Sequence, residues 1–188
     1  MSTPVGLESY PLEMSADDAA AEPQPPGLNI RVQHQKQTYW CWAAVASTVS
    51  YFYAIGSPWS QCALASEAFP TGNCCENGSL KSCNDTFDLD KAFAFTGNLD
   101  GSPVNDQVQV ADLINAIGIG APVCIRIEWD NGQGHFVIVR NAMDYGAGGS
   151  VAISDPLYGE SVHSIADLNG NYLNGNDGRW TDTYYTKG

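Results

Sequence analysis

The hydrophobic pattern of the chain changes its period near residue 119, and this change constrains the fold more than any other feature. Before it, apolar residues recur at helical spacing; after it, β-rich runs are separated by turns of Gly, Asn and Asp. Four helices are expected. The first covers 41–54 and ends at Gly56, and the second has Ser57 as its N-cap and Pro58 as its first residue. The third covers 88–96 and ends at Gly97, and the fourth covers 110–117 and ends at Gly118. The expected strands cover 28–33, 122–129, 135–140, 150–154, 160–165 and 179–185. Helices that precede strands, rather than alternating with them, predict an α+β fold with an antiparallel sheet.

The length of 188 residues fits one domain with a substantial core, and a hydrophobic content of 44% excludes a globally disordered chain. Residues 1–28 differ from the rest, because they are rich in Pro and acidic residues and contain no Lys or Arg. They predict a disordered tail or a pro-segment, and their lack of apolar periodicity favours the tail. We expect a single catalytic domain over 29–188, with a helical part over about 35–118 and a β part over about 119–188.

The formal charge of −13 argues against binding to nucleic acid or to an anionic membrane surface. No apolar run is as long as a transmembrane helix, and the first residues lack the basic and apolar regions of a signal peptide. Six cysteines, four of them between 62 and 83, are nevertheless typical of an oxidising compartment. Export without a classical signal peptide, or prior removal of the signal, would reconcile these observations.

A cysteine stands in the first turn of the most apolar expected helix, in the sequence Tyr39-Trp-Cys41-Trp-Ala. A thiol at a helix N-terminus faces unpaired backbone N–H groups and the positive end of the helix dipole, which stabilise the thiolate. Gln35 is placed to fold back and to supply its side-chain amide, beside the Cys41 backbone N–H, as a pair of oxyanion donors. A lone cysteine in an apolar helix is as often a buried core residue. The assignment of Cys41 as a nucleophile therefore depends on partners elsewhere.

Two residues at the ends of expected strands provide such partners. His135 follows Gly132-Gln-Gly134 and opens an apolar strand, so its ring is expected at a strand end that faces the helix N-terminus. Asp155 ends the next strand, and if the two strands pair, it accepts from the second ring nitrogen of His135 and fixes the tautomer. The order Gln35, Cys41, His135 and Asp155, each at an element terminus, indicates a Cys-His-Asp triad with an oxyanion donor.

The segments 35–44, 134–139 and 154–156 resemble the papain-like cysteine peptidases, and they are most similar to the compact bacterial branch of avirulence-type effector peptidases and bacteriocin-leader-peptidase-like enzymes. The resemblance spans roughly residues 30–158. It implies a helical subdomain with the nucleophile that faces a β subdomain with the histidine, and a substrate cleft between them. By position it implies Cys41 as nucleophile, His135 as general base and acid, Asp155 as the residue that orients His135, and Gln35 as oxyanion donor.

The sequence departs from the larger papain-like enzymes in two ways. Asp155 stands where they have Asn, as in the compact branch, and no cysteine directly precedes Cys41, so the disulfide of that helix is absent. The remaining cluster is expected to brace the helical subdomain through the disulfide candidates Cys62, Cys74, Cys75 and Cys83. Because adjacent cysteines rarely bond each other, the pairing is either 62–74 with 75–83 or 62–75 with 74–83.

Other chemistry-bearing residues are expected to be structural. A zinc site is an alternative for the four clustered sulfurs, but they lack Cys-x-x-Cys spacing and have no histidine nearby. Cys124 lies inside an apolar strand and is expected to be an inert buried thiol. Trp42 is expected to be a cleft wall that shields the catalytic pair from water. His34 is interpreted as a solvated loop residue and His163 as a structural strand residue.

The leading hypothesis is a secreted cysteine peptidase that hydrolyses peptide bonds through an acyl-enzyme. We expect a protein or peptide substrate, no metal or organic cofactor, no nucleic acid or membrane partner, and a monomer. The same triad also fits a deamidase, a transglutaminase or another acyl transferase, since the shape of the cleft selects the acceptor. A peptide-binding module with an inert Cys41 is the non-enzymatic alternative.

Overall fold

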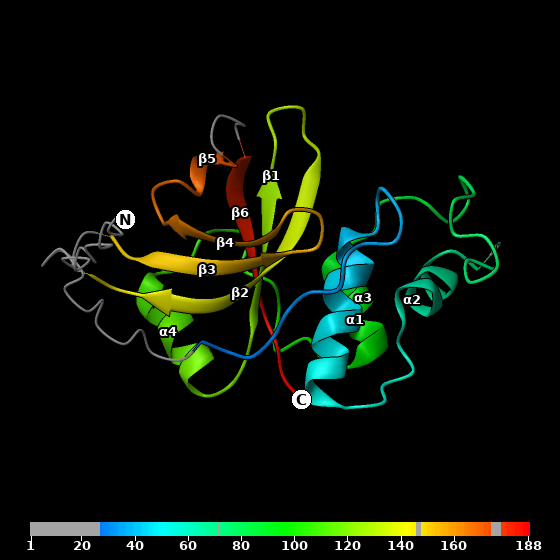
Figure 1. Cartoon of the computed structure of the whole chain (residues 1–188), viewed down its shortest axis with the longest axis horizontal. Coiled ribbons are helices and arrows are strands. Elements are labelled where there is room, and N and C mark those ends of the chain that lie inside the picture. The colour runs from blue at the N-terminus through cyan, green and yellow to red at the C-terminus, as the bar shows by residue number, and fades with distance from the viewer. Residues whose placement is uncertain (1–26, 71, 146–147, 174–177) are drawn as a thin grey trace, which may run out of the picture.

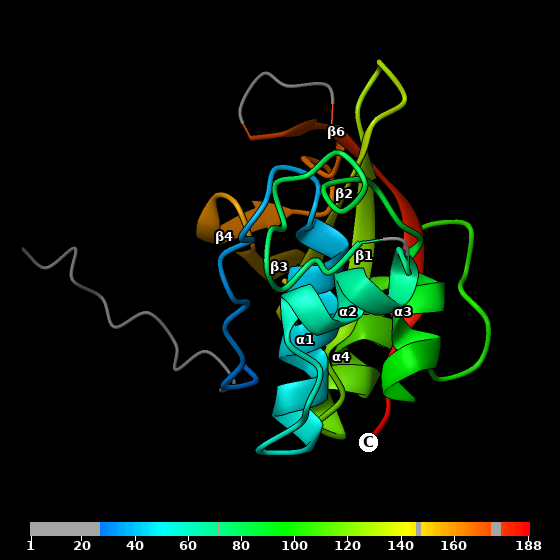
Figure 2. The ribbon, with the colours of Figure 1, turned by 90° about the vertical axis from the view of Figure 1, so that its right-hand side faces the viewer.

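Three helices lie on one side of an antiparallel sheet, and a fourth helix lies on its other side (Figures 1 and 2). This computed structural model describes residues 27–70, 72–145, 148–173 and 178–188. The expected tail at 1–28 lies almost wholly outside these residues. The helices are α1 (Cys41–Tyr53), α2 (Gln61–Ala68), α3 (Leu89–Thr96) and α4 (Val110–Gly118). None of the helices in the described part of the chain is long and apolar enough to span a membrane.

The sheet contains six strands in the order β4-β3-β2-β1-β6-β5, and all neighbouring strands are antiparallel. The strands are β1 (Val123–Glu128), β2 (Gly134–Met143), β3 (Ser150–Asp155), β4 (Gly159–Ser164), β5 (Asn169–Tyr172) and β6 (Gly178–Tyr185). The order of helices before strands confirms the α+β prediction. The sheet is curled so strongly that its two edges meet: the ring centroids of His163 on β4 and Tyr172 on β5 are 4.8 Å apart.

The two faces of the sheet bury separate apolar cores. Helix α1 is buried from Cys41 to Ser50, so this part of it packs on all sides, against α2 and α3 and against Phe136 and Ile138 of β2. The alternate residues of β1 and β2, such as Ile125 and Val137, face a second core beneath α4. The sequence places α4 in the helical part, whereas in the structure this helix packs on β2 and β1, because the strands are apolar on both faces.

The loop between α2 and α3 is held by two disulfides, Cys62–Cys75 and Cys74–Cys83, which is the second of the two pairings that the sequence left open. The four sulfurs are therefore bonded to each other and do not act as metal ligands. Two indole N–H groups join this loop to the start of α1: Trp40 Nε1 donates to the Cys83 carbonyl at 2.8 Å, and Trp42 Nε1 donates to the Asp85 carbonyl at 3.1 Å. The disulfide loop thus abuts the N-terminus of the buried helix.

Two local expectations are wrong, and one strand was not expected. Residues 28–33 form no strand, because Val32 N donates to the Ser154 hydroxyl instead of to a ladder carbonyl. Helix α2 begins three residues later than expected, since Ser60 rather than Ser57 caps it by accepting from Ala63 N. Strand β5 was not expected at all, because its sequence Asn-Gly-Asn-Tyr172 lacks alternating apolar residues.

Candidate active site

Cys41 is the first residue of α1, and its side chain opens into a cleft between the helices and the sheet. The preceding residue, Trp40, makes no side-chain cap, so the N–H groups of the first turn keep their capacity to donate to a ligand. Cys41 itself is 8% exposed, as befits a helix that is otherwise fully buried at this end. The thiol is free, as is that of Cys124.

His135 and Asp155 come together because β2 and β3 pair in antiparallel register, with Ile138 opposite Ser154. The start of β2 and the end of β3 then lie at the same side of the sheet, and His135 Nε2 donates to Asp155 Oδ1 at 2.9 Å. The second ring nitrogen, Nδ1, is not used by Asp155, and His135 and Cys41 line the same cleft. The structure thus joins His135 to Asp155 by a hydrogen bond and places Cys41 beside the same cleft.

The buried ring of His135 is held in its charged form. Burial by itself would lower the pKa of His135, but the hydrogen bonds to Asp155 and Cys41 outweigh it and raise the pKa to about 9. The reverse holds for Asp155, where burial would raise the pKa, but the hydrogen bond and charge of His135, followed by Tyr172 and the Tyr158 backbone, lower it. The pair therefore favours an imidazolium at His135 beside an ionised Asp155 carboxylate.

Besides His135, three further donors hold the Asp155 carboxylate in place. Its Oδ1 also accepts from the backbone N–H groups of Leu157 at 2.7 Å and Tyr158 at 2.9 Å, which the turn after Pro156 directs back at the carboxylate. Its Oδ2 accepts from the hydroxyl of Tyr172 at 2.6 Å. Sequence reasoning did not find Tyr172, because its strand carries no hydrophobic signal and lies at the opposite edge of the sheet.

Gln35 lies in the cleft wall beside Cys41 and is buried. Its backbone N–H donates to the Pro156 carbonyl at 2.9 Å, which ties it to the turn that follows Asp155. Its side-chain Nε2 donates to the carbonyls of Gln37 at 3.0 Å and Thr38 at 2.8 Å. Its Oε1 is buried and has no hydrogen-bond partner among the described residues. Both N–H groups of the Gln35 side-chain amide therefore bond to carbonyls of the loop that follows it.

The cleft that contains Cys41 and His135 has a volume of about 930 Å³. Its helical wall consists of the loop before α1, Trp42 and residues 86–88, and its sheet wall consists of Arg126, residues 129–136, Leu157 and Tyr158. Trp42 is 1% exposed and packs against Phe87 and Phe69, so it forms a rigid aromatic wall next to the thiol. A cleft of this volume leaves room for a bound ligand beside Cys41 and His135.

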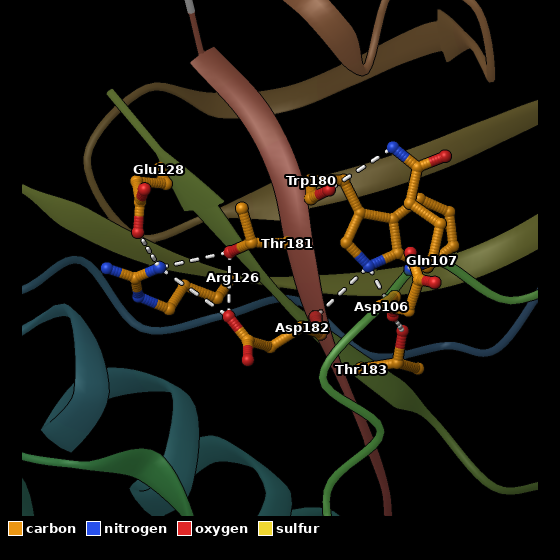
Figure 3. Close-up of polar contacts among 8 residues, drawn as sticks. All are labelled: Asp106, Gln107, Arg126, Glu128, Trp180, Thr181, Asp182 and Thr183. Atoms are coloured by element: carbon orange, nitrogen blue, oxygen red, sulfur yellow. Dashed lines mark hydrogen bonds and ion pairs between the residues drawn. The ribbon is translucent and has the colours of Figure 1, made fainter. Parts of the chain in front are cut away.

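Arg126 is anchored in the sheet wall by its neighbours on β1 and β6 (Figure 3). Its Nη1 donates to the Thr181 hydroxyl at 3.0 Å and pairs with Glu128 and Asp182. Thr181 is the extra residue of a bulge, since Arg126 lies opposite Asp182 and Ile127 opposite Trp180. A Cβ at Gly134 would lie 2.5 Å from Arg126 Nε, so the glycine before His135 is what lets the guanidinium pack there.

The remaining histidines and the second free cysteine do not line the cleft. His34 is exposed, and its Nδ1 lies 2.9 Å from the Gln35 carbonyl. His163 is half-buried and lies beside Tyr172, and burial lowers its pKa. Cys124 is fully buried in the core, and burial raises the pKa of its thiol. The described residues contain no cluster of side chains suited to hold a metal ion.

Comparisons with known proteins identify the family of the chain. The family described as papain-like cysteine protease AvrRpt2 matches residues 26–172. One distantly similar solved structure is that of the Pseudomonas avirulence protein AvrPphB, which is 12% identical with a TM-score of 0.41 and covers 86% of this chain and 98% of its own. Another comes from a study of the mite allergens Blo t 1 and Der p 1; it is 15% identical with a TM-score of 0.48 and covers 96% of this chain and 75% of its own. No curated protein sequence matches the chain. On the family match, which covers most of its length, the chain belongs to the papain-like cysteine proteases of the AvrRpt2 family and is a cysteine-type peptidase.

Proposed function

We propose that this peptidase cleaves peptide bonds of a protein or peptide substrate with Cys41 as nucleophile, His135 as general base and acid, and Asp155 as the residue that orients His135. The observation that carries the proposal is that only one of the two ring nitrogens of His135 is bound to Asp155. Nε2 is bound to Asp155, which leaves Nδ1 available to exchange a proton with Cys41 across the cleft that both residues line.

The geometry supports a reaction in two halves. The Cys41 sulfur forms a bond to the carbonyl carbon while the carbonyl electron pair moves to oxygen, and the tetrahedral species then expels the amine, which takes its proton from His135 Nδ1. In the second half, a water gives its proton to Nδ1 and its oxygen attacks the thioester carbon. The carbon–sulfur bond breaks, and the acid product leaves the regenerated Cys41.

The oxyanion donors in this proposal are the Cys41 backbone N–H and the amide of Gln35. Both N–H groups of Gln35 donate to loop carbonyls in the free enzyme, so an oxyanion must compete with the Gln37 or Thr38 carbonyl for one of them. A charged acceptor forms the stronger hydrogen bond, roughly twice as strong as a neutral one, which favours the exchange only once negative charge develops. Gln35 would then stabilise the transition state more than the bound substrate.

The disulfides and the net charge bear on the compartment in which the enzyme acts and on its partners. Two disulfides in the cleft-bearing part of the chain are typical of oxidising compartments, and we propose an exported enzyme that acts as a monomer. The net charge of −13 disfavours nucleic acid and anionic membranes as partners.

The test combines covalent labelling with three variants. An epoxide-type papain inhibitor should modify Cys41 and leave the buried Cys124 unmodified, as read by peptide mapping. Cys41→Ala and His135→Ala should each lower kcat/KM on a peptide library by a factor on the order of 10⁴ or more, and Asp155→Ala by less. Cys124→Ala removes the other free thiol and should keep its turnover. Normal turnover by Cys41→Ala, or labelling confined to other residues, would refute the proposal.

A further inference from the structure

The carboxylate of Asp155 is held at both of its oxygens. Oδ1 accepts from His135 and from two backbone N–H groups, while Oδ2 accepts from the Tyr172 hydroxyl at 2.6 Å, the shortest of these contacts. Asp155 is 3% exposed and Tyr172 is 0% exposed, so water does not substitute for either partner. A buried carboxylate needs donors at both oxygens to remain ionised.

The fold brings Tyr172 to this place from the far edge of the sheet. Asp155 ends β3, and Tyr172 ends β5, with three strands between their own strands in the sheet order. Only the curl of the sheet lets the two edges meet, and there the Tyr172 ring packs against Trp129 and His163. These contacts fix the ring, and so the direction from which the hydroxyl reaches Asp155.

We propose that Tyr172 is a positioning residue of the active site: its hydroxyl keeps Asp155 ionised and directs Oδ1 at His135. This role rests on the proposed function of the triad and extends it to a fourth side chain. Tyr172 acts through Asp155 and touches neither the thiol nor the imidazole in any contact described above.

A purely structural role for Tyr172 would predict a different outcome. The aromatic ring alone closes the sheet against Trp129 and His163, and Phe would preserve this packing. Tyr172→Phe therefore separates the hydroxyl from the ring. Tyr53→Phe is the matched control, since it removes a hydroxyl that bonds to Thr186 at 2.9 Å and has no contact with Asp155 among the described residues.

Removal of the Tyr172 hydroxyl should change the ionisation of Asp155 at acidic pH. The pKa of Asp155 is lowered in the folded protein, so the carboxylate supports His135 above the ordinary pKa of Asp and is lost as the pH falls through the lowered value. Removal of one donor raises this pKa. The ion pair should then fail at a higher pH, while the alkaline side, set by His135, changes less.

The titratable groups that face Asp155 are His135 on β2, Tyr172 on β5 and His163 on β4. His163 matters because its ring lies against that of Tyr172, with ring centroids 4.8 Å apart, and its Nε2 lies 2.9 Å from the Ser161 hydroxyl. His163 titrates in the acidic range as well, since burial lowers its pKa. The experiment must therefore separate its effect from that of Asp155.

The experiment measures the rate at which iodoacetamide alkylates Cys41 between pH 3 and 10, with the site assigned by peptide mapping. Tyr172→Phe should shift the acidic limb of the profile upward by about one pH unit, the size expected for one hydrogen bond to a charged group. Tyr53→Phe should leave the limb in place. The shift should persist when His163→Gln is present in both proteins, and its disappearance there would assign the effect to His163 and overturn the proposal.

Two outcomes separate this proposal from the proposed function. If wild-type Cys41 reacts in mildly acidic solution and Tyr172→Phe gives the same profile, the triad stands and the role of Tyr172 is wrong. If wild-type Cys41 does not react below pH 7, the ion pair is absent and both proposals fail. Should Tyr172→Phe not fold, NMR of the wild type decides: a slowly exchanging Tyr172 hydroxyl proton supports the bond to Asp155, and free exchange with water contradicts the proposal.

Discussion

The buried imidazole of His135 determines how the site responds to pH. Its ring lies between a carboxylate and a thiol, and these two partners raise its pKa to about 9 although burial opposes them. The unfolded chain has the ordinary value of about 6.5. Protonation of His135 therefore stabilises the folded state, fully below about pH 6.5, and this stabilisation is lost as the pH rises through about 9.

We expect the His135 resonance to titrate near pH 9 in an NMR experiment, which is practical because the chain has three histidines. In urea unfolding, the stability difference between wild type and His135→Gln should shrink from pH 6 to pH 10. The activity should fall over the same interval, since the imidazolium that protonates the leaving amine is lost. A His135 titration at or below 6.5 would contradict this account.

The disulfide-bonded loop between α2 and α3 contributes both to the stability of the fold and to one wall of the cleft. The Cys83 and Asp85 carbonyls accept from Trp40 and Trp42, the two residues that flank Cys41, and the next residues, 86–88, line the cleft. The Cys74–Cys83 bridge closes the part of the loop that carries the first of these carbonyls. The Cys62–Cys75 bridge instead ties the loop to α2.

Replacing both Cys74 and Cys83 by Ser should lower the free energy of unfolding by about 2–3 kcal/mol, the entropic value for a short loop, and should raise KM for a peptide substrate. The matched control replaces Cys62 and Cys75 by Ser. It should cost a similar free energy of unfolding, read in urea, with a smaller effect on KM. Equal KM values for the two double variants would show that the indole contacts do not transmit the loop position to the cleft.

The sequence predicted the elements whose signals are local. The Cys41 helix was apparent from its apolar run, and the ends of β2 and β3 were apparent from the Gly turn before His135 and the Asp-Pro pair at 155–156. Tyr172 was not, because its contact with Asp155 depends on the curl of the whole sheet rather than on any pattern within β5. The choice between the two disulfide pairings likewise required coordinates, since both pairings satisfy the same spacing.

The two halves of the molecule are joined by the segment 27–35, which we call the strap and which crosses from the sheet to the start of α1 (Figure 1). Leu28 N donates to the Arg140 carbonyl of β2, and Val32 N donates to the Ser154 hydroxyl of β3. Gln33 then bonds to α1, through its backbone to Thr48 and through its side chain to Ser47. The strap therefore sets the position of α1 against the sheet, and with it the distance across the cleft.

This arrangement predicts opposite results for two truncations. A chain that begins at Gly27 keeps the strap contacts named above, and we expect its urea midpoint and its kcat/KM to match those of the full chain, since the truncation removes only residues of the expected tail at 1–28. A chain that begins at His34 loses these hydrogen bonds and the buried Ile30 side chain, at a cost of roughly 5 kcal/mol, which is a large part of the stability of a typical domain. Ile30→Ala in the full chain should show the apolar share of this loss, about 2–4 kcal/mol, with the strap bonds intact. Reduced activity of the Gly27 chain with unchanged stability would instead assign residues 1–26 a part in the reaction.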